Sequence, residues 1–165
     1  MIDANRRTLL KGSLAVGSVG ALVATGLATG VLAPRLALAD WNQAAFAATD
    51  RDAALKALLG DSAPQTNEAV LIKVPDIAEN GAVVPVTVEI NPAADLKGVT
   101  AIAILATGNE QPLIASYVLG PAALPFVSTR IKMAKTADVV AVVTQGERFF
   151  SNAKNVKVTI GGCGS

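Results

Sequence analysis

The chain has 165 residues, of which 14 are lysine or arginine and 13 are aspartate or glutamate, and it contains one cysteine and no histidine. The absence of histidine excludes Ser-His-Asp and Cys-His nucleophile pairs, histidine-ligated haem and most zinc sites. The sequence also has no Cys-x-x-Cys pair and no phosphate-binding loop, so catalytic chemistry has little to use except the single cysteine, Cys163.

The first 39 residues have the composition of an export signal. Arg6 and Arg7 precede an apolar stretch rich in glycine and alanine, from about residue 12 to 33, and an Ala-x-Ala sequence ends at Ala39. This order is typical of a secretory signal peptide, and the paired arginines resemble the twin-arginine signal of bacteria. We expect export by the twin-arginine route, cleavage between Ala39 and Asp40, and a periplasmic location.

The alternative is that the same stretch remains as a membrane anchor, because about 20 apolar residues can span a bilayer. Cleavage would remove four of the 14 basic residues and one of the 13 acidic residues, which leaves a net charge of −2. That balance argues against a nucleic-acid partner, which would require a basic stripe. An odd cysteine in an exported protein indicates either an intermolecular disulfide or a free reactive thiol.

A short helical segment is expected within residues 40–64. Thr49 or Asp50 can cap a helix, and apolar residues then recur at helical spacing until Gly60 and Pro64 end it. The pattern predicts a helix over residues 50–59, and we expect a further helical turn before it, around Phe46.

Residues 65–160 show the period-two alternation of strands. Val84, Val86, Val88 and Ile90 alternate with Pro85 and other outward residues, which predicts a half-buried strand. Because proline lacks an N–H, this strand should have an exposed edge or a bulge at Pro85. The stretch over residues 98–107 is apolar on both faces and predicts a central strand. Five further strands are expected within residues 67–75, 112–120, 125–133, 138–146 and 155–162.

About seven short strands without a helical crossover indicate an antiparallel β-sandwich of immunoglobulin-like type. The disulfide and buried tryptophan of antibody domains are missing, so only the architecture is expected to match. Aromatic residues make up 4% of the chain, and a partner covering one sheet would add to a core built mainly from smaller side chains. The strand of Pro85 and the apolar face around Ile102–Ile104 are the candidate surfaces for that partner.

Cys163 follows the last predicted strand and is flanked by Gly161, Gly162 and Gly164. Glycine visits both halves of φ/ψ space, so residues 161–165 are expected to form a flexible arm. Three extended residues would carry the thiol about 10 Å beyond the sandwich. The residues alone leave three alternatives open: a covalent carrier of a small group, a disulfide tether that joins an exported structural subunit to another chain, or an inert tail.

Several stretches and the twin-arginine leader together resemble SoxY, the sulfur-carrier subunit of the bacterial thiosulfate-oxidising Sox system. The stretches are DIAENGAVVPVTVEI (76–90), FVSTRIKMAKTADVVAVV (126–143) and VKVTIGGCGS (156–165). The resemblance implies a sandwich that pairs with a SoxZ subunit, and a substrate carried on Cys163 as an S-thiosulfonate or persulfide. One departure is Ser165, where the family usually has glycine.

The resemblance also implies a set of partner enzymes. A SoxXA cytochrome would couple thiosulfate to the thiol, a dimanganese SoxB hydrolase would release sulfate, and a molybdenum–haem SoxCD dehydrogenase, where present, would oxidise the remaining sulfur. Haem, manganese and molybdenum would then belong to the partners. The chain itself is expected to be a carrier without a cofactor or a metal rather than an enzyme.

Overall fold

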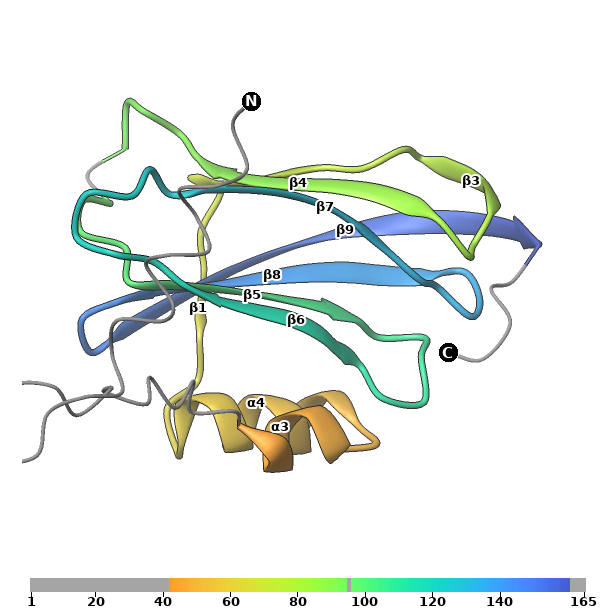
Figure 1. Ribbon diagram of the computed structural model, residues 1–165, viewed down its shortest axis with the longest axis horizontal. Helices are drawn as coiled ribbons and strands as arrows, with labels where there is room; N and C mark the ends of the chain where they lie inside the picture. Colours follow the sequence, from red (N-terminus) through yellow and green to blue (C-terminus); the bar gives the residue numbers. More distant parts are fainter. Residues whose placement is uncertain (1–41, 95, 161–165) are drawn as a thin grey trace, which may run out of the picture. The chain divides into compact units, whose positions relative to one another are not determined.

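Two short helices lead into nine strands in the described part of the chain, which comprises residues 42–94 and 96–160 of the computed structural model (Figure 1). The helices are α3 (Gln43–Ala47) and α4 (Arg51–Leu59). The strands are β1 (Gln65–Thr66), β2 (Val70–Lys73), β3 (Ile77–Asn80), β4 (Val84–Ile90), β5 (Ala101–Ala106), β6 (Leu113–Val118), β7 (Phe126–Ile131), β8 (Ala137–Gln145) and β9 (Arg148–Ile160). The predicted export signal, with Arg6, Arg7, Ala39 and Asp40, lies outside the described residues.

The predicted helix over residues 50–59 is confirmed as α4, and its ends have the expected chemistry. The side chain of Asp50 accepts a hydrogen bond of 2.8 Å from the amide of Ala53 at the start. At the other end Gly60 has a φ of 68° and donates its amide to the carbonyl of Lys56. A residue with positive φ is usually glycine, so Gly60 ends the helix where the sequence predicts. The turn expected around Phe46 is the helix α3.

The larger sheet has the strand order β1-β9-β8-β5-β6, with β3 also paired to β9. Neighbouring strands are antiparallel along β9-β8-β5-β6, whereas β1 and β3 both run parallel to β9. The antiparallel sandwich of immunoglobulin-like type is confirmed, and the two short strands β1 and β3 add parallel pairs at this edge. Strand β9 also begins at Arg148, seven residues before the predicted strand, because a tight turn at Gly146 joins it directly to β8.

The smaller sheet has the order β2-β4-β7. Residues of β4 alternate as predicted, with Val84, Val86 and Val88 buried and Pro85 exposed. Pro85 pairs with β7 on one side, but the β2 register ends two residues away, at Lys73↔Thr87. The expected open edge at Pro85 is therefore confirmed.

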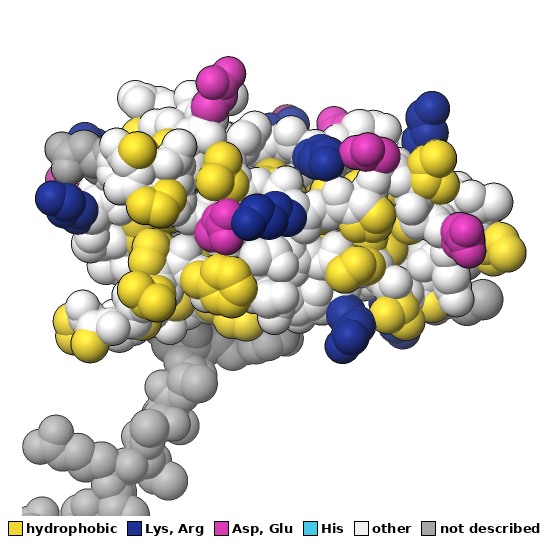
Figure 2. Space-filling model, turned by 90° about the horizontal axis from the view of Figure 1, so that it is seen from above, with side chains coloured by type: hydrophobic (Ala, Val, Ile, Leu, Met, Phe, Trp, Pro, Cys, Tyr) yellow, Lys and Arg dark blue, Asp and Glu magenta, His cyan; other side chains and the backbone are white. Residues whose placement is uncertain are grey.

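The outer face of this smaller sheet is polar enough to be an ordinary solvated surface. Lys73 and Glu89 form an ion pair of 2.6 Å across β2 and β4, and the hydroxyls of Thr87 and Ser128 lie 3.1 Å apart. Figure 2 looks down on this face and shows basic and acidic side chains among the apolar ones.

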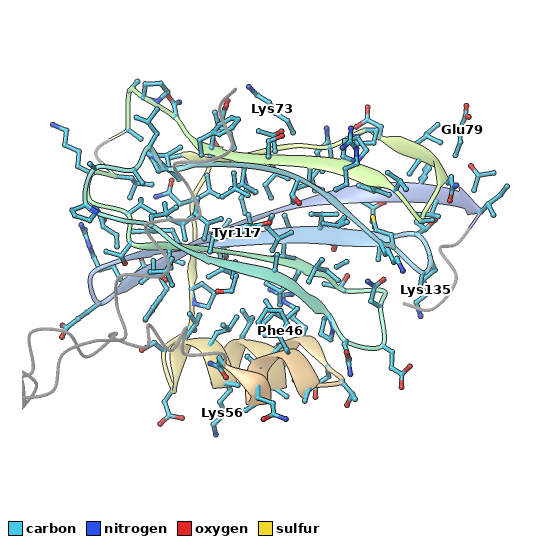
Figure 3. The ribbon with its side chains drawn as sticks, viewed as in Figure 1. Phe46, Lys56, Lys73, Glu79, Tyr117 and Lys135 are labelled. Carbon is cyan, nitrogen blue, oxygen red and sulfur yellow. The ribbon has the colours of Figure 1, made fainter. Side chains whose placement is uncertain are left out.

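Both faces of the central strand β5 are covered within the chain. Ile102 and Ile104 are fully buried between the two sheets, in the core where Tyr117 also packs (Figure 3). On the opposite face Leu105 is buried beneath α3 and α4, where Phe46 packs against the same cluster. The further residues of this helix-covered cluster are Ala45, Ala54, Leu55, Ala103, Leu113, Val140 and Val142.

The face around Ile102–Ile104 is therefore not available to a partner, and that expectation is wrong. The prediction that this strand is apolar on both faces is confirmed, and α3 and α4 cover the second face. Within residues 42–94 and 96–160, no helix is both long and apolar enough to span a bilayer.

Candidate functional site

The predicted attachment residue Cys163 lies outside the described residues, as do Gly161, Gly162 and Gly164. The structure instead describes the strand from which that segment leaves, and this strand ends at Ile160 as the sequence predicts. We call the last four residues of β9, residues 157–160, the arm root.

The arm root extends past the end of the sandwich on a strand pair of its own. The last residue of β9 that pairs with β8 is Val156, opposite Ala137. Beyond that point β3 supplies the pairing, with Ala78 opposite Val158 and Asn80 opposite Ile160. Figure 1 shows β3 alongside the end of β9, at the end of the body where the chain continues toward its C-terminus.

Hydrogen bonds hold the arm root on both sides. The amide of Lys157 donates to the carbonyl of Asp76 at 3.0 Å, and the carbonyl of Ile160 accepts from Gly81 at 2.7 Å. On the opposite side, where β8 no longer pairs with β9, the amide of Val158 donates to the hydroxyl of Thr136 at 2.9 Å. Because paired backbone groups resist local opening, the chain is held in position as far as Ile160.

Three connections are hydrogen-bonded to one another next to the arm root: the β3–β4 turn, the β5–β6 turn and the segment between β7 and β8. The carbonyl of Gly81, in the turn between β3 and β4, accepts from the amide of Met133, whose side chain is fully buried. The side chain of Asn109, in the turn between β5 and β6, donates to the carbonyl of Lys132 and accepts from the amide of Ala134, both at 2.8 Å. Asn109 is 8% exposed, so these bonds are shielded from water and hold the segment between β7 and β8.

The charged groups around the arm root are only partly neutralised. The amine of Lys154 lies 3.1 Å from the carboxylate of Asp76 and also donates to the carbonyl of Val74. Lys135 and Lys157 are exposed, and neither is in an ion pair with another described residue. Figure 3 shows Lys135 at the end of the body where β9 stops.

Sequence reasoning missed the residues that hold this segment. Strand β3 spans four residues, with the burial pattern exposed, buried, exposed, exposed, which is too short for periodicity to show. One signal was available: Asn80-Gly81 is a dipeptide typical of tight turns, and it joins β3 to β4. Thr136 and Asn109 carry no local signal, because their partners lie more than 20 positions away in the sequence.

A cavity of about 580 Å³ lies at the other end of the body, between the β4–β5 and β6–β7 connections. Its lining is mainly apolar, and Lys97 is its one charged residue among those described. No three acidic, cysteine or histidine residues within residues 42–94 and 96–160 lie close enough together to hold a metal ion.

Comparison with known proteins identifies the family. A family model described as "Sulfur oxidation protein SoxY" matches residues 55–163. The solved structure of the sulfur carrier protein SoxY from Chlorobium limicola f thiosulfatophilum is 41% identical, with a TM-score of 0.59, and the match covers 69% of this chain and 96% of that one. The chain belongs to the SoxY family. The resemblance seen in the sequence is thereby confirmed, and so is a role in sulfur oxidation.

Other comparisons add nothing to this. A superoxide reductase (neelaredoxin) from Ignicoccus hospitalis matches 66% of this chain and 92% of its own at 17% identity, with a TM-score of 0.47, and we draw no argument from it. A search of curated proteins found no match. Membership of the SoxY family implies that the chain works with other components of the Sox system.

Proposed function

We propose that this SoxY-family chain is a covalent carrier of sulfur intermediates in thiosulfate oxidation, with the substrate attached to the thiol of Cys163. The observation that carries the proposal is the family match, which extends through residue 163 and so includes the single cysteine. The described strand supports it, because β9 is held in position up to Ile160, three residues before that thiol. The C. limicola protein of 41% identity is itself described as a sulfur carrier.

The chemistry needs one thiol and external enzymes. In the loading step the Cys163 thiol and thiosulfate form a new S–S bond, giving a cysteine S-thiosulfonate, and one proton and two electrons leave. Water then cleaves the bond between the sulfane and sulfonate sulfurs, releasing sulfate and two protons and leaving a persulfide anion, R–S–S⁻, on the carrier. Thiolates and persulfides are good nucleophiles and leaving groups in such exchanges.

The partners in this proposal supply everything that the carrier lacks. A SoxXA-like cytochrome accepts the two electrons at haem, a SoxB-like dimanganese hydrolase performs the sulfate release, and a SoxCD-like molybdenum–haem dehydrogenase, where present, oxidises the persulfide sulfur. A SoxZ-like subunit forms a heterodimer with the carrier. The carrier needs no cofactor or metal of its own and is not an enzyme by itself.

The cycle belongs in the periplasm. We propose that residues 1–39 direct export through the twin-arginine route and are removed between Ala39 and Asp40. The residues that support this are Arg6, Arg7 and the apolar stretch that follows them.

The intact mass of the protein from cells grown on thiosulfate tests both proposals. A chain that starts at Asp40 and carries a series of reductant-labile sulfur adducts on Cys163 is the expected result. A single stable disulfide to another subunit would show that Cys163 is a tether instead. The variant Cys163→Ser should abolish thiosulfate oxidation while the protein keeps its fold, and activity retained by that variant would contradict the carrier function.

A further inference from the structure

We propose that Asn80 is a site of spontaneous deamidation, and that the pairing of β3 with the end of β9 controls how fast it reacts. Asn80 and Gly81 lie where β3 turns into β4, and they form the single Asn-Gly pair in the 165-residue sequence. The turn lies beside the arm root, where Asn80 is the strand partner of Ile160 (Figure 1). The inference does not depend on the proposed carrier function.

The reaction needs only water and the chain itself. The backbone nitrogen of Gly81 loses its proton and attacks Cγ, the carbonyl carbon of the Asn80 side chain. The bond from Cγ to the side-chain nitrogen breaks, and this nitrogen leaves as ammonia with the proton. The product is a five-membered succinimide ring. Water then opens the ring at one of its two carbonyls, which gives either aspartate or isoaspartate.

The local chemistry of the turn favours the attack. The side chain of Asn80 is exposed, and Gly81 has no Cβ to hinder the approach of its nitrogen. The side-chain oxygen of Asn80 accepts a hydrogen bond of 2.8 Å from the amide of Ala82, which draws electron density from Cγ. Asn91 and Asn155 show the contrast, because a proline without an N–H follows the first and a β-branched valine follows the second.

The tertiary structure opposes the attack at the same nitrogen. Gly81 is buried, its amide donates to the carbonyl of Ile160 at 2.7 Å, and its carbonyl accepts from the amide of Met133 at 2.7 Å. The nitrogen cannot lose its proton and turn toward Cγ while the bond to Ile160 is intact. Reaction therefore requires a local opening in which the end of β9 separates from β3, and its rate follows the population of that open state. The bond from Val158 to Thr136 stabilises the closed state from the other side of β9.

Isoaspartate would stabilise the open state once it has formed. The main chain then runs through Cγ and is one carbon atom longer between Glu79 and Gly81. Gly81 is tied to two separate elements, to β9 through Ile160 and to the segment between β7 and β8 through Met133, so the longer chain cannot keep both bonds. The aspartate product adds a negative charge, but its main chain is unchanged and its carboxylate can still accept from Ala82. The two products therefore differ in their effect on the arm root.

The test follows deamidation of the purified protein at mildly alkaline pH by peptide mass spectrometry, with fragmentation that separates isoaspartate from aspartate. A synthetic peptide of residues 77–83 gives the rate without the fold. Thr136→Val removes the acceptor of the Val158 amide and so favours opening. The matched control is Asp50→Ala, which also removes the acceptor of one backbone amide, but at the start of α4. Asn80→Gln identifies the reacting residue, because the longer side chain would have to close a six-membered ring.

We expect the folded protein to react about ten- to a hundredfold more slowly than the peptide, because more than one hydrogen bond has to open first. Thr136→Val should accelerate the reaction about fivefold, the effect of losing one net hydrogen bond, and Asp50→Ala should stay within about twofold of the unsubstituted protein, because α4 opens separately. Asn80→Gln should lose no ammonia at this position. The amide of Met133 should exchange faster in the isoaspartate product than in freshly prepared Asn80→Asp.

Three results would each overturn the inference. The first is an equal rate in the folded protein and the peptide, which would show that the pairing with β9 does not control the reaction. The second is an equal acceleration in Asp50→Ala, which would show that general destabilisation is sufficient. The third is an unreacted Asn80 in Thr136→Val over a period in which the peptide has reacted completely, which would show that this position is not a deamidation site.

Discussion

Replacing Asn109 by alanine should destabilise the protein more than any other single change to a polar side chain of the β5–β6 turn. The side chain makes two hydrogen bonds of 2.8 Å, to the carbonyl of Lys132 and from the amide of Ala134, and it is 8% exposed. Asn109→Ala leaves both backbone groups without their partner in a place that water reaches poorly. Each buried group left unpaired costs about 1–3 kcal/mol, so the expected loss for the two groups is about 2–6 kcal/mol.

Urea unfolding followed by circular dichroism measures this loss as a shift in the midpoint at constant slope. The matched control is Asn155→Ala. Asn155 is exposed and its amide bonds to the carboxylate of Asp138, so its loss should be below about 0.5 kcal/mol, as for most surface changes. Equal losses in the two variants would refute the reasoning, because the expected contrast depends on the burial and the number of the backbone groups that Asn109 satisfies.

Three further changes have expected results. Ile104→Ala removes a fully buried side chain between the sheets and should lower the free energy of unfolding by about 2–5 kcal/mol in urea titrations; a loss under about 1 kcal/mol would contradict the assigned burial. Asp50→Ala removes the cap that accepts from the amide of Ala53 and should lower it by about 1 kcal/mol, whereas Asp50→Asn should be close to neutral. Thr136→Val deprives the amide of Val158 of its acceptor, so hydrogen exchange at Val158 should accelerate by about tenfold; unchanged exchange would show that this bond does not hold the arm root.

Much of the fold could be predicted because its causes are local. The cap at Asp50 and the positive φ at Gly60 place both ends of α4. The alternation of Val84, Val86 and Val88 identifies the inward face of β4. Pro85 marks the place where β2 stops pairing with β4, because a residue without an N–H cannot complete a two-sided ladder.

The candidate site could be predicted only in part. A single cysteine among glycines indicates a carried group or a tether from composition alone. The supports of the preceding strand could not be predicted in the same way. The hydrogen-bond partners of three residues are distant in the sequence or lie on another connection; these residues are Thr136, Gly81 and Asn109. A parallel strand pairing such as Ile77↔Lys157 likewise produces no local sequence pattern.

The sequence by itself determined the element types, the inward face of β4 and the position of the cysteine immediately after the last strand, since each depends on neighbouring residues. The tertiary structure alone decided what covers each face of β5. Both faces of this strand are apolar: Ile102 and Ile104 lie on one face, and Ala103 and Leu105 on the other. The sequence therefore indicates burial on both sides but does not indicate which elements cover each face. That choice depends on where α3, α4 and the second sheet pack, which is a matter of long-range contact.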